Sequence, residues 1–329
     1  MKRKSLYFVA PGSVEIREEE VSGTGRLLVR ALHSAVSAGT ELLAFRGLVP
    51  AEMQRDETIP VLAGTFAFPF KYGYSMVGEV LSAPADMKEW EGKKVFSFHP
   101  HEDLFFAEPD SLFPLPQGAV PAEVSLLPSM ETAVHLLRDG RPMAGEKAAV
   151  FGQGVIGLLV TRLLSGMLVS ELVTFDLHPL RREKSLEMGA TESVDPLSPG
   201  ALDRFRSDAD LIFELSGNPA ALDGAIRTAA YGGRIVVGSW YGNRSAVLDL
   251  GGFFHRGNIR ITSSQVSRIP SEQSVRWTRR RRIETALKLL LRGGLPEIVT
   301  HRFPFGKAAE AYRTLAENPR EVLQVIFDY

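Results

Sequence analysis

Three glycines in the stretch VFGQGVIG constrain the fold of this chain more than any other feature. Gly152, Gly154 and Gly157 have the spacing G-x-G-x-x-G, between a run KAAVFG that predicts a strand and a run VIGLLVTRLLSG that predicts a helix. This spacing permits a tight turn, close approach of the backbone to a phosphate group, and close packing of helix on strand. The start of the helix, with Val155 and Ile156, would offer free N–H groups and positive potential. The stretch therefore predicts a phosphate-binding turn.

An acidic residue strengthens this interpretation. Asp176 ends the next predicted strand, ELVTFD, 19 residues beyond Gly157, where an acid can bind a ribose 2′-hydroxyl. A carboxylate there would repel a 2′-phosphate, which favours NAD over NADP. Arg181 and Arg182 lie close by in sequence and weaken that preference. A glycine-rich turn in a nucleotide-free α/β domain is the alternative, and it leaves the acid unexplained.

The segment from Gly145 onward alternates between predicted strands and helices. After ELVTFD follow the helix PLRREKSLEMGA, a short strand near Ser193, the strand ADLIFELSG, the helix PAALDGAIRTAAYGG, and the strands RIVVGSW and NIRITSSQV. Strands alternating with helices of this length predict a parallel, doubly wound sheet, and hence an α/β fold.

The first 118 residues differ, with many short β-type runs punctuated by Gly and Pro. The segment PAEVSLLPSMETAVHLLRDG then predicts a helix or a helix pair ending at Gly140. The tail returns to a mixed pattern, with a helix from about Arg279 to Arg292, a strand near HRFPF, a helix KAAEAYRTLAEN and a final strand. A chain of 329 residues suits two domains.

Composition excludes several classes of function. A net charge of −1 gives no global signal for nucleic acid or an anionic membrane, and no apolar run approaches a membrane span. The chain has no cysteine, which excludes disulfides, a thiol nucleophile and thiolate zinc sites. We expect a cytoplasmic protein.

The order of a β-rich domain, a dinucleotide-binding unit and a return segment resembles the medium-chain dehydrogenase/reductase family over essentially the whole chain. The resemblance implies a GroES-like catalytic domain in residues 1–140, a Rossmann domain in 141–266, and a return segment, 267–329, that completes the catalytic domain. It also implies a site in the cleft between the domains. The stretch SAGTELLAFRG is most similar to a zinc-poor subgroup that includes hydroxyethyl-bacteriochlorophyllide dehydrogenases.

Zinc-dependent members of that family carry a Cys-Gly-Thr-Asp type motif, a Gly-His-Glu motif and a third ligand before the Rossmann domain. The matching positions here hold Ala38, then Tyr74 and Ser75 in KYGYS, then Pro128. Catalytic zinc needs about three protein ligands and an open position. The resemblance therefore implies a metal-site scaffold, and we expect no catalytic zinc.

Hydride transfer without zinc requires another group at the substrate oxygen. The resemblance places Thr40 at the family's proton-relay hydroxyl, and Tyr74 could present a phenol in the vacated metal pocket. Glu41 would orient them. Two alternatives stay open: Tyr74 fills the hole with its ring, and Thr40 has a purely structural hydrogen bond.

The resemblance also implies residues around the nicotinamide and the substrate. Cofactor contacts are expected from Ser216, Ser239 and Ser264, and the expected substrate pocket residues are Glu131, Trp240 and His255. Packing, a helix-dipole role for Glu131 and a surface loop around His255 are the alternatives. His99 and His101 could bind a metal, although an ordinary loop pair is favoured. The five arginines between Arg276 and Arg282 favour a solvated helix start over a nucleic-acid patch.

Together these features predict a zinc-independent, NAD(H)-dependent oxidoreductase that interconverts a secondary alcohol and a carbonyl, acting on a small molecule. An NADPH-dependent quinone or enoyl reductase and a non-catalytic dinucleotide sensor remain alternatives. The resemblance further implies a homodimer that pairs through the edge strand around Ile259 to Ser264.

Overall fold

The computed structural model describes the whole chain except residues 22–24, 294 and 296. These described parts divide into two compact units, each with its own hydrophobic core. Unit 1 consists of Met1–Pro128, Leu287–Arg292 and Val299–Tyr329, and unit 2 consists of Ser129–Ala286 and Gly293–Ile298.

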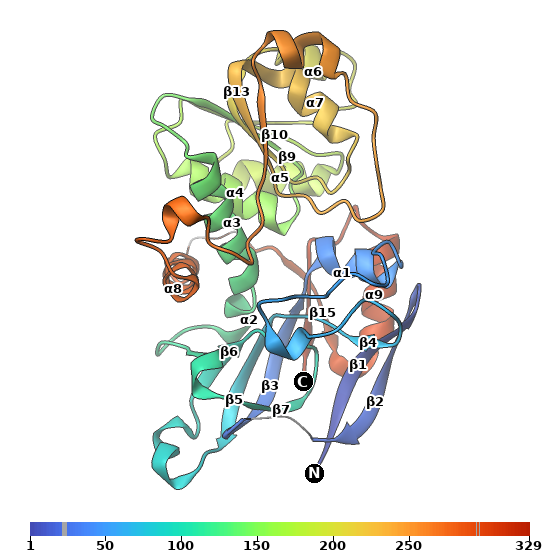
Figure 1. Cartoon of the computed structure of the whole chain (residues 1–329), viewed down its shortest axis with the longest axis vertical. Helices are drawn as coiled ribbons and strands as arrows, with labels where there is room; N and C mark the ends of the chain where they lie inside the picture. Colours follow the sequence, from blue (N-terminus) through green and yellow to red (C-terminus); the bar gives the residue numbers. More distant parts are fainter. Residues whose placement is uncertain (22–24, 294, 296) are drawn as a thin grey trace. The chain divides into compact units, whose positions relative to one another are not determined.

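Unit 1 contains two sheets (Figure 1). The first has the order β2-β1-β4, from Ser13–Glu20, Lys2–Ala10 and Phe70–Lys71. The second has the order β15-β16-β3-β5-β6-β8, from Val299–Pro304, Gln324–Asp328, Leu27–Val36, Met76–Ser82, Lys94–Ser97 and Leu112–Pro114, and β7 (Leu104–Ala107) also pairs with β3. All of these strand pairs are antiparallel except β15 with β16. The C-terminal strand thus completes a sheet begun by the N-terminal third.

The helical segments of unit 1 are short. They are α1 (Ala38–Phe45), α2 (Pro121–Val124), α9 (Ala308–Glu317) and the 3₁₀ turns η1 (Pro60–Leu62), η2 (Ala85–Trp90), η3 (Pro109–Ser111) and η6 (Phe305–Lys307). Val29 and Ala31 of β3 pack with Val80 of β5 and Phe105 of β7 in the core. Consecutive residues are buried at both ends of β3, so parts of this strand are covered on both faces.

Unit 2 contains one six-stranded parallel sheet of order β11-β10-β9-β12-β13-β14. Its strands are Glu192–Val194, Glu171–Phe175, Lys147–Phe151, Ala209–Glu214, Ala229–Val237 and Arg260–Ser263. This is the 3-2-1-4-5-6 order of a doubly wound dinucleotide-binding sheet, so the predicted topology is confirmed. Almost every residue of β9 and β10 is buried, as expected for strands covered on both faces.

The helices that lie wholly or partly in unit 2 match most of the predicted ones. They are α3 (Leu127–Gly140), α4 (Val155–Ser165), α5 (Pro179–Glu187), α6 (Ala201–Arg204), α7 (Ala221–Thr228) and α8 (Arg279–Leu290), with the turns η4 (Leu250–Phe254) and η5 (Ser271–Gln273). The helix expected to continue through AAYGG instead ends at Thr228, and those residues begin β13. Tyr231 favours a strand there, and the two glycines disfavour continuation of the helix.

The unit boundaries lie elsewhere than the expected 140/141 and 266/267. Unit 2 begins at Ser129 and keeps residues up to Ala286. The reason is packing along α3: a Cβ on Gly140 would lie 2.6 Å from Phe213 Cζ, and one on Gly238 would lie 2.7 Å from Leu136 Cδ2. The helix therefore packs on the parallel sheet.

Candidate functional site: a dinucleotide turn and a hydroxyl cluster

The glycine-rich turn connects β9 to α4 in unit 2. Gly152 has a φ of +90°, and a Cβ there would lie 2.4 Å from Ser216 Cα. A Cβ on Gly157 would lie 2.0 Å from the Gly152 carbonyl oxygen, so α4 approaches the turn too closely for any side chain. A Cβ on Gly154 would meet nothing within 4 Å. The turn is therefore tightly packed at two glycines and open at the third, which fits a pyrophosphate at the start of α4.

Asp176 lies beside this turn, as its position after β10 requires. Its Oδ2 accepts a hydrogen bond from Gln153 N at 2.7 Å, and its Oδ1 accepts one from His178 N at 2.9 Å. Arg181 Nη1 is 3.9 Å from Asp176 Oδ2, and Arg182 Nη1 donates to the Asp176 carbonyl at 2.9 Å. The structure thus brings the predicted acid and the predicted arginine together beside the turn. A carboxylate and a guanidinium beside a glycine-rich turn fit the adenosine end of a dinucleotide.

Ser216 and Ser239 lie in the loops after β12 and β13, at the same carboxyl-terminal edge of the sheet. Gly217 N donates to Ser239 Oγ at 2.9 Å, which joins the two loops. Both loops are anchored by Glu214, a fully buried residue at the end of β12 that the sequence reasoning missed. Its signal was an acid closing an apolar strand in FELSG, the same pattern that identified Asp176.

The other residues expected near the nicotinamide and substrate are placed differently. Ser264 Oγ donates to Asp139 Oδ2 of α3 at 2.7 Å, and Trp240 directly follows Ser239. His255 is exposed and precedes β14. In a parallel sheet the residues before a strand lie at the edge opposite to those after it, so the structure does not bring His255 to Ser216 and Ser239.

Glu131 and the arginine run form a buried ion pair. Arg282 is fully buried, donates through Nε and Nη2 to Glu131 Oε1 at 2.9 and 2.8 Å, and places Nη1 3.0 Å from His135 Nδ1. A solvated helix start describes Arg280, whose side chain is 57% exposed, but for Arg282 it is wrong. The reason is the helical period, which turns one arginine of the run onto α3.

A cluster of hydroxyl groups lies in unit 1 where the sequence predicted a vacated metal site. Tyr74 donates its phenolic proton to Ser37 Oγ at 2.5 Å. Burial raises the pKa of Tyr74 to about 12, although hydrogen bonds with Ser37 and Thr40 act in the opposite direction. The structure therefore brings together Tyr74, Thr40 and Ser37, the last of which the sequence reasoning missed. The phenol stays protonated near neutral pH and can donate a hydrogen bond or a proton.

Glu41 supports this hydroxyl cluster through the backbone of Ser37. Its Oε1 accepts from Ser37 N at 2.7 Å, and its Oε2 is contacted by His101 Nε2 and by the Tyr312 hydroxyl. His99 bonds a different carboxylate, Glu102, at 2.9 Å. The two histidines thus belong to separate clusters.

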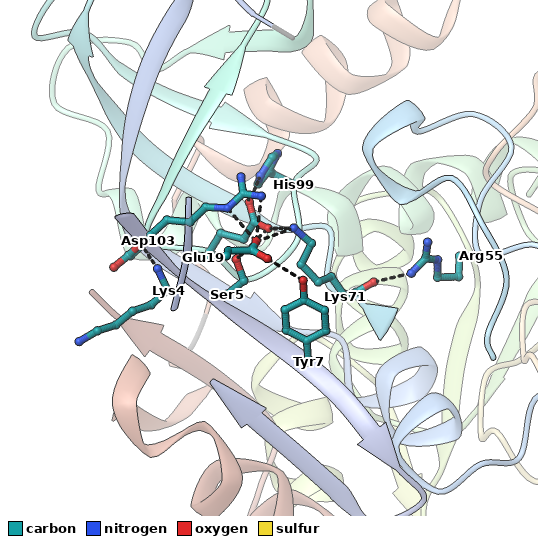
Figure 2. Close-up of polar contacts among 10 residues, drawn as sticks. Lys4, Ser5, Tyr7, Glu19, Arg55, Lys71, His99 and Asp103 are labelled. Atoms are coloured by element: carbon teal, nitrogen blue, oxygen red, sulfur yellow. Dashed lines mark hydrogen bonds and ion pairs between the residues drawn. The ribbon is translucent and has the colours of Figure 1, made fainter. Parts of the chain in front are cut away.

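A charged cluster joins β1, β2 and β4 to the loop before β7 in unit 1. Lys71 and Tyr7 both point toward Glu19 (Figure 2), with Lys71 Nζ 3.0 Å from Glu19 Oε1 and the Tyr7 hydroxyl 2.7 Å from Glu19 Oε2. Arg3 bridges Glu19 and Glu102 at 2.9 and 3.1 Å. The cluster therefore fixes the loop that carries His101.

The residues at the family's metal positions do not fit zinc. Ala38 offers no donor atom, and Ser75 Oγ donates its proton to the Ser125 carbonyl. Tyr74 is bonded to Ser37, and its raised pKa opposes formation of a phenolate ligand. Within the described residues, no group of three or more His, Cys, Asp and Glu side chains could hold a metal ion.

In the described part of the chain, none of the helices has the length and apolar character needed to cross a bilayer.

The chain is similar to known dehydrogenases over most of its length. Residues 155–290 match the family model of zinc-binding dehydrogenases. The chain is 25% identical to D-guloside 3-dehydrogenase of Escherichia coli over 94% of this chain and 95% of that one. It is 27% identical to 2-desacetyl-2-hydroxyethyl bacteriochlorophyllide A dehydrogenase of Cereibacter sphaeroides, over 93% and 91%.

Solved structures show the same fold. The structure of 2R,3R-butanediol dehydrogenase from Bacillus subtilis superposes with a TM-score of 0.80 at 19% identity, covering 99% of both chains. An alcohol dehydrogenase from Escherichia coli solved with NADH has a TM-score of 0.79 at 17% identity, over 100% and 99% of the two chains. A zinc-binding dehydrogenase from Sinorhizobium meliloti solved with NADP has a TM-score of 0.78 at 16% identity, over 100% of both.

Proposed function

Since the chain belongs to the medium-chain dehydrogenase/reductase family, with a GroES-like unit 1 and a Rossmann unit 2, we propose that it is an NAD(H)-dependent oxidoreductase. Its reaction interconverts a secondary alcohol and a carbonyl compound without a catalytic zinc. The observation that carries the proposal is the hydroxyl cluster of Tyr74, Thr40 and Ser37, which lies in unit 1 where zinc-dependent members of the family hold their metal. Unit 2 separately supplies an intact dinucleotide turn.

The cofactor preference rests on Asp176. Its carboxylate lies beside the turn, and an acid in this position accepts from a ribose 2′-hydroxyl and repels a 2′-phosphate. Arg181 is the residue that could reverse the preference, since a guanidinium 3.9 Å from that carboxylate could pair with a phosphate. Once bound, a nicotinamide cofactor supplies the hydride donor and acceptor.

The chain's own contribution is proton control at the substrate oxygen. When a carbonyl is reduced, its oxygen gains negative charge and then a proton. Tyr74 remains protonated because burial raises its pKa, and Thr40 adds a second hydroxyl beside it. These hydroxyls can stabilise the developing charge and donate the proton. Glu41 holds Ser37 in place through its backbone N–H.

The names of the two relatives suggest which substrates to test first. The D-guloside 3-dehydrogenase and the bacteriochlorophyllide dehydrogenase are both named for oxidation of a substrate larger than a simple alcohol. We therefore expect a hydroxylated small molecule, and we begin with glycosides and polyols. We further propose a cytoplasmic homodimer that pairs through β14, the last strand of the parallel sheet. Light scattering of the purified chain tests the dimer.

Calorimetric titration of the EDTA-treated protein with NADH and then with NADPH tests the proposal first. Tight binding of NADH and weak binding of NADPH, followed by turnover of a secondary alcohol without added metal, is the expected result. A preference for NADPH would instead favour a quinone or enoyl reductase. Cofactor binding without turnover on any substrate would favour a dinucleotide sensor, and turnover only after addition of Zn²⁺ would refute the zinc-free reaction.

A further inference from the structure

Glu214 is a fully buried carboxylate at the carboxyl-terminal edge of the parallel sheet. Its Oε1 accepts hydrogen bonds from Ser216 N at 2.9 Å and from Ser216 Oγ, and its Oε2 accepts one from the Tyr241 hydroxyl at 2.6 Å. Burial and this bond raise the pKa of Tyr241, so the phenol remains a donor. One carboxylate therefore holds the loop after β12 and the loop after β13 together.

The backbone of the same residue reinforces the connection. The Glu214 carbonyl accepts from Gly238 N at 3.0 Å and from Ser239 N at 3.2 Å. Ser216 in turn lies against the glycine-rich turn, since a Cβ on Gly152 would lie 2.4 Å from its Cα. The loops that follow β9, β12 and β13 thus meet at Glu214.

The charge of Glu214 is not balanced locally. Within the described residues it forms no ion pair, although a buried carboxylate usually has a cationic partner. The nearest cation on these loops, Arg244, donates to the Tyr241 carbonyl at 3.1 Å and is exposed. Three hydrogen-bond donors contact the carboxylate oxygens of Glu214. None of the three carries a positive charge, so the carboxylate at this edge of the sheet has no counter-charge among them.

In a sheet of this order a dinucleotide lies across the point where the strand order reverses, between β9 and β12. Asp176, after β10, then faces the adenosine half, and the loops after β12 and β13 face the nicotinamide half. We propose that Glu214 is a positioning residue for the nicotinamide half and that its charge favours the oxidised cofactor. The oxidised nicotinamide ring is cationic and the reduced ring is neutral. This inference rests on the proposed function, because it assumes a nicotinamide cofactor.

Calorimetric titrations of the full chain with NAD⁺, NADH and ADP-ribose test the proposal. ADP-ribose contains the adenosine and pyrophosphate but lacks nicotinamide. Glu214→Gln keeps the size of the side chain and removes the charge, so it should weaken NAD⁺ relative to NADH by about fivefold, the order of magnitude that one partly screened charge produces. Tyr241→Phe keeps the charge and removes one hydrogen bond. It should weaken NAD⁺ and NADH equally, and ADP-ribose should bind both variants like the wild type.

Thermal denaturation of each variant accompanies the titrations. An unchanged NAD⁺ to NADH affinity ratio in folded Glu214→Gln would overturn the role of the charge, because a merely structural Glu214 would leave that ratio unchanged. If Tyr241→Phe lost as much affinity for ADP-ribose as for NAD⁺ and NADH, the positioning role would be overturned. This variant decides that point if Glu214→Gln does not fold. A wild-type chain that binds none of the three ligands would refute the proposed function itself.

Discussion

His101 Nε2 lies 3.0 Å from Glu41 Oε2, and both side chains are fully buried. On its other side, His101 Nδ1 lies 2.7 Å from Ser34 Oγ. A neutral imidazole with its proton on Nε2 satisfies both contacts, since it donates to Glu41 and accepts from Ser34. Tyr312 donates to the same carboxylate. The described contacts of Glu41 are therefore all with hydrogen-bond donors. Through the bond that Glu41 accepts from Ser37 N, it also fixes the position of Ser37.

Replacement of Glu41 by glutamine should destabilise unit 1. A neutral amide presents an NH₂ group to one of the donors now facing Glu41, which leaves a buried polar group unsatisfied. We expect the free energy of unfolding to fall by about 2–4 kcal/mol, as for other buried hydrogen-bonded charges. Urea denaturation measures this. Glu52→Gln is the control, because Glu52 is exposed, and equal stability of the two variants would contradict the role of the Glu41 contacts.

The charged cluster of Figure 2 should make the stability of the chain depend on acid. Burial alone would raise the pKa of Glu102, but its bonds with His99 and Lys71 reverse this and lower the pKa to about 2. Such a carboxylate stabilises the fold above the unfolded pKa of about 4.3, and the contribution is lost as the pH falls toward 2. The difference corresponds to about 3 kcal/mol. Burial also lowers the pKa of His99, so protonation of the unfolded chain below about pH 6.5 acts in the same direction.

Urea denaturation at pH 7 and at pH 3 tests this dependence. Between the two values the wild-type chain should lose about 2 kcal/mol through Glu102, since pH 3 lies between the unfolded and the folded pKa of this group. Glu102→Gln should be less stable at pH 7 and should lose less on acidification. The exposed Glu89→Gln serves as the comparison. If Glu102→Gln and wild type lose equal stability between pH 7 and pH 3, Glu102 is not the group that titrates.

The features that could be predicted from the sequence are those that depend on residues close together in the chain. The glycine-rich turn, Asp176 and the parallel sheet follow from short patterns within one strand–loop–helix repeat, and the structure has them where expected. The partners of Glu41 could not be found in this way, because Tyr312 lies 271 positions away and carries no local signal. His99 and His101 illustrate the same limit. Their spacing suggested one shared role, but they lie in a loop, and each bonds a different glutamate.

Two glycines of the turn should respond differently to alanine. In Gly157→Ala the new methyl would lie 2.0 Å from the Gly152 carbonyl oxygen, so the backbone must move and both stability and NADH affinity should fall. In Gly154→Ala the methyl meets no atom within 4 Å, so stability should be unchanged while NADH affinity falls at least tenfold through occupation of the open cradle. Thermal denaturation and calorimetry separate the two effects. Unchanged NADH affinity in Gly154→Ala would place the pyrophosphate elsewhere.

Tyr74→Phe should distinguish a catalytic phenol from a ring that fills the vacated metal pocket. The variant keeps the ring and removes the proton donor, so kcat on the substrate found by screening should fall by about 10²-fold or more while the Kd for NADH is unchanged. Because burial raises the pKa of Tyr74 to about 12, the wild-type rate should show no Tyr74 titration between pH 6 and pH 10. Tyr7→Phe is the matched control: the pKa of Tyr7 is also raised to about 12, but its hydroxyl bonds Glu19 in the charged cluster. Full turnover in Tyr74→Phe would leave Tyr74 a space-filling role and would make Thr40 the remaining candidate for the proton donor.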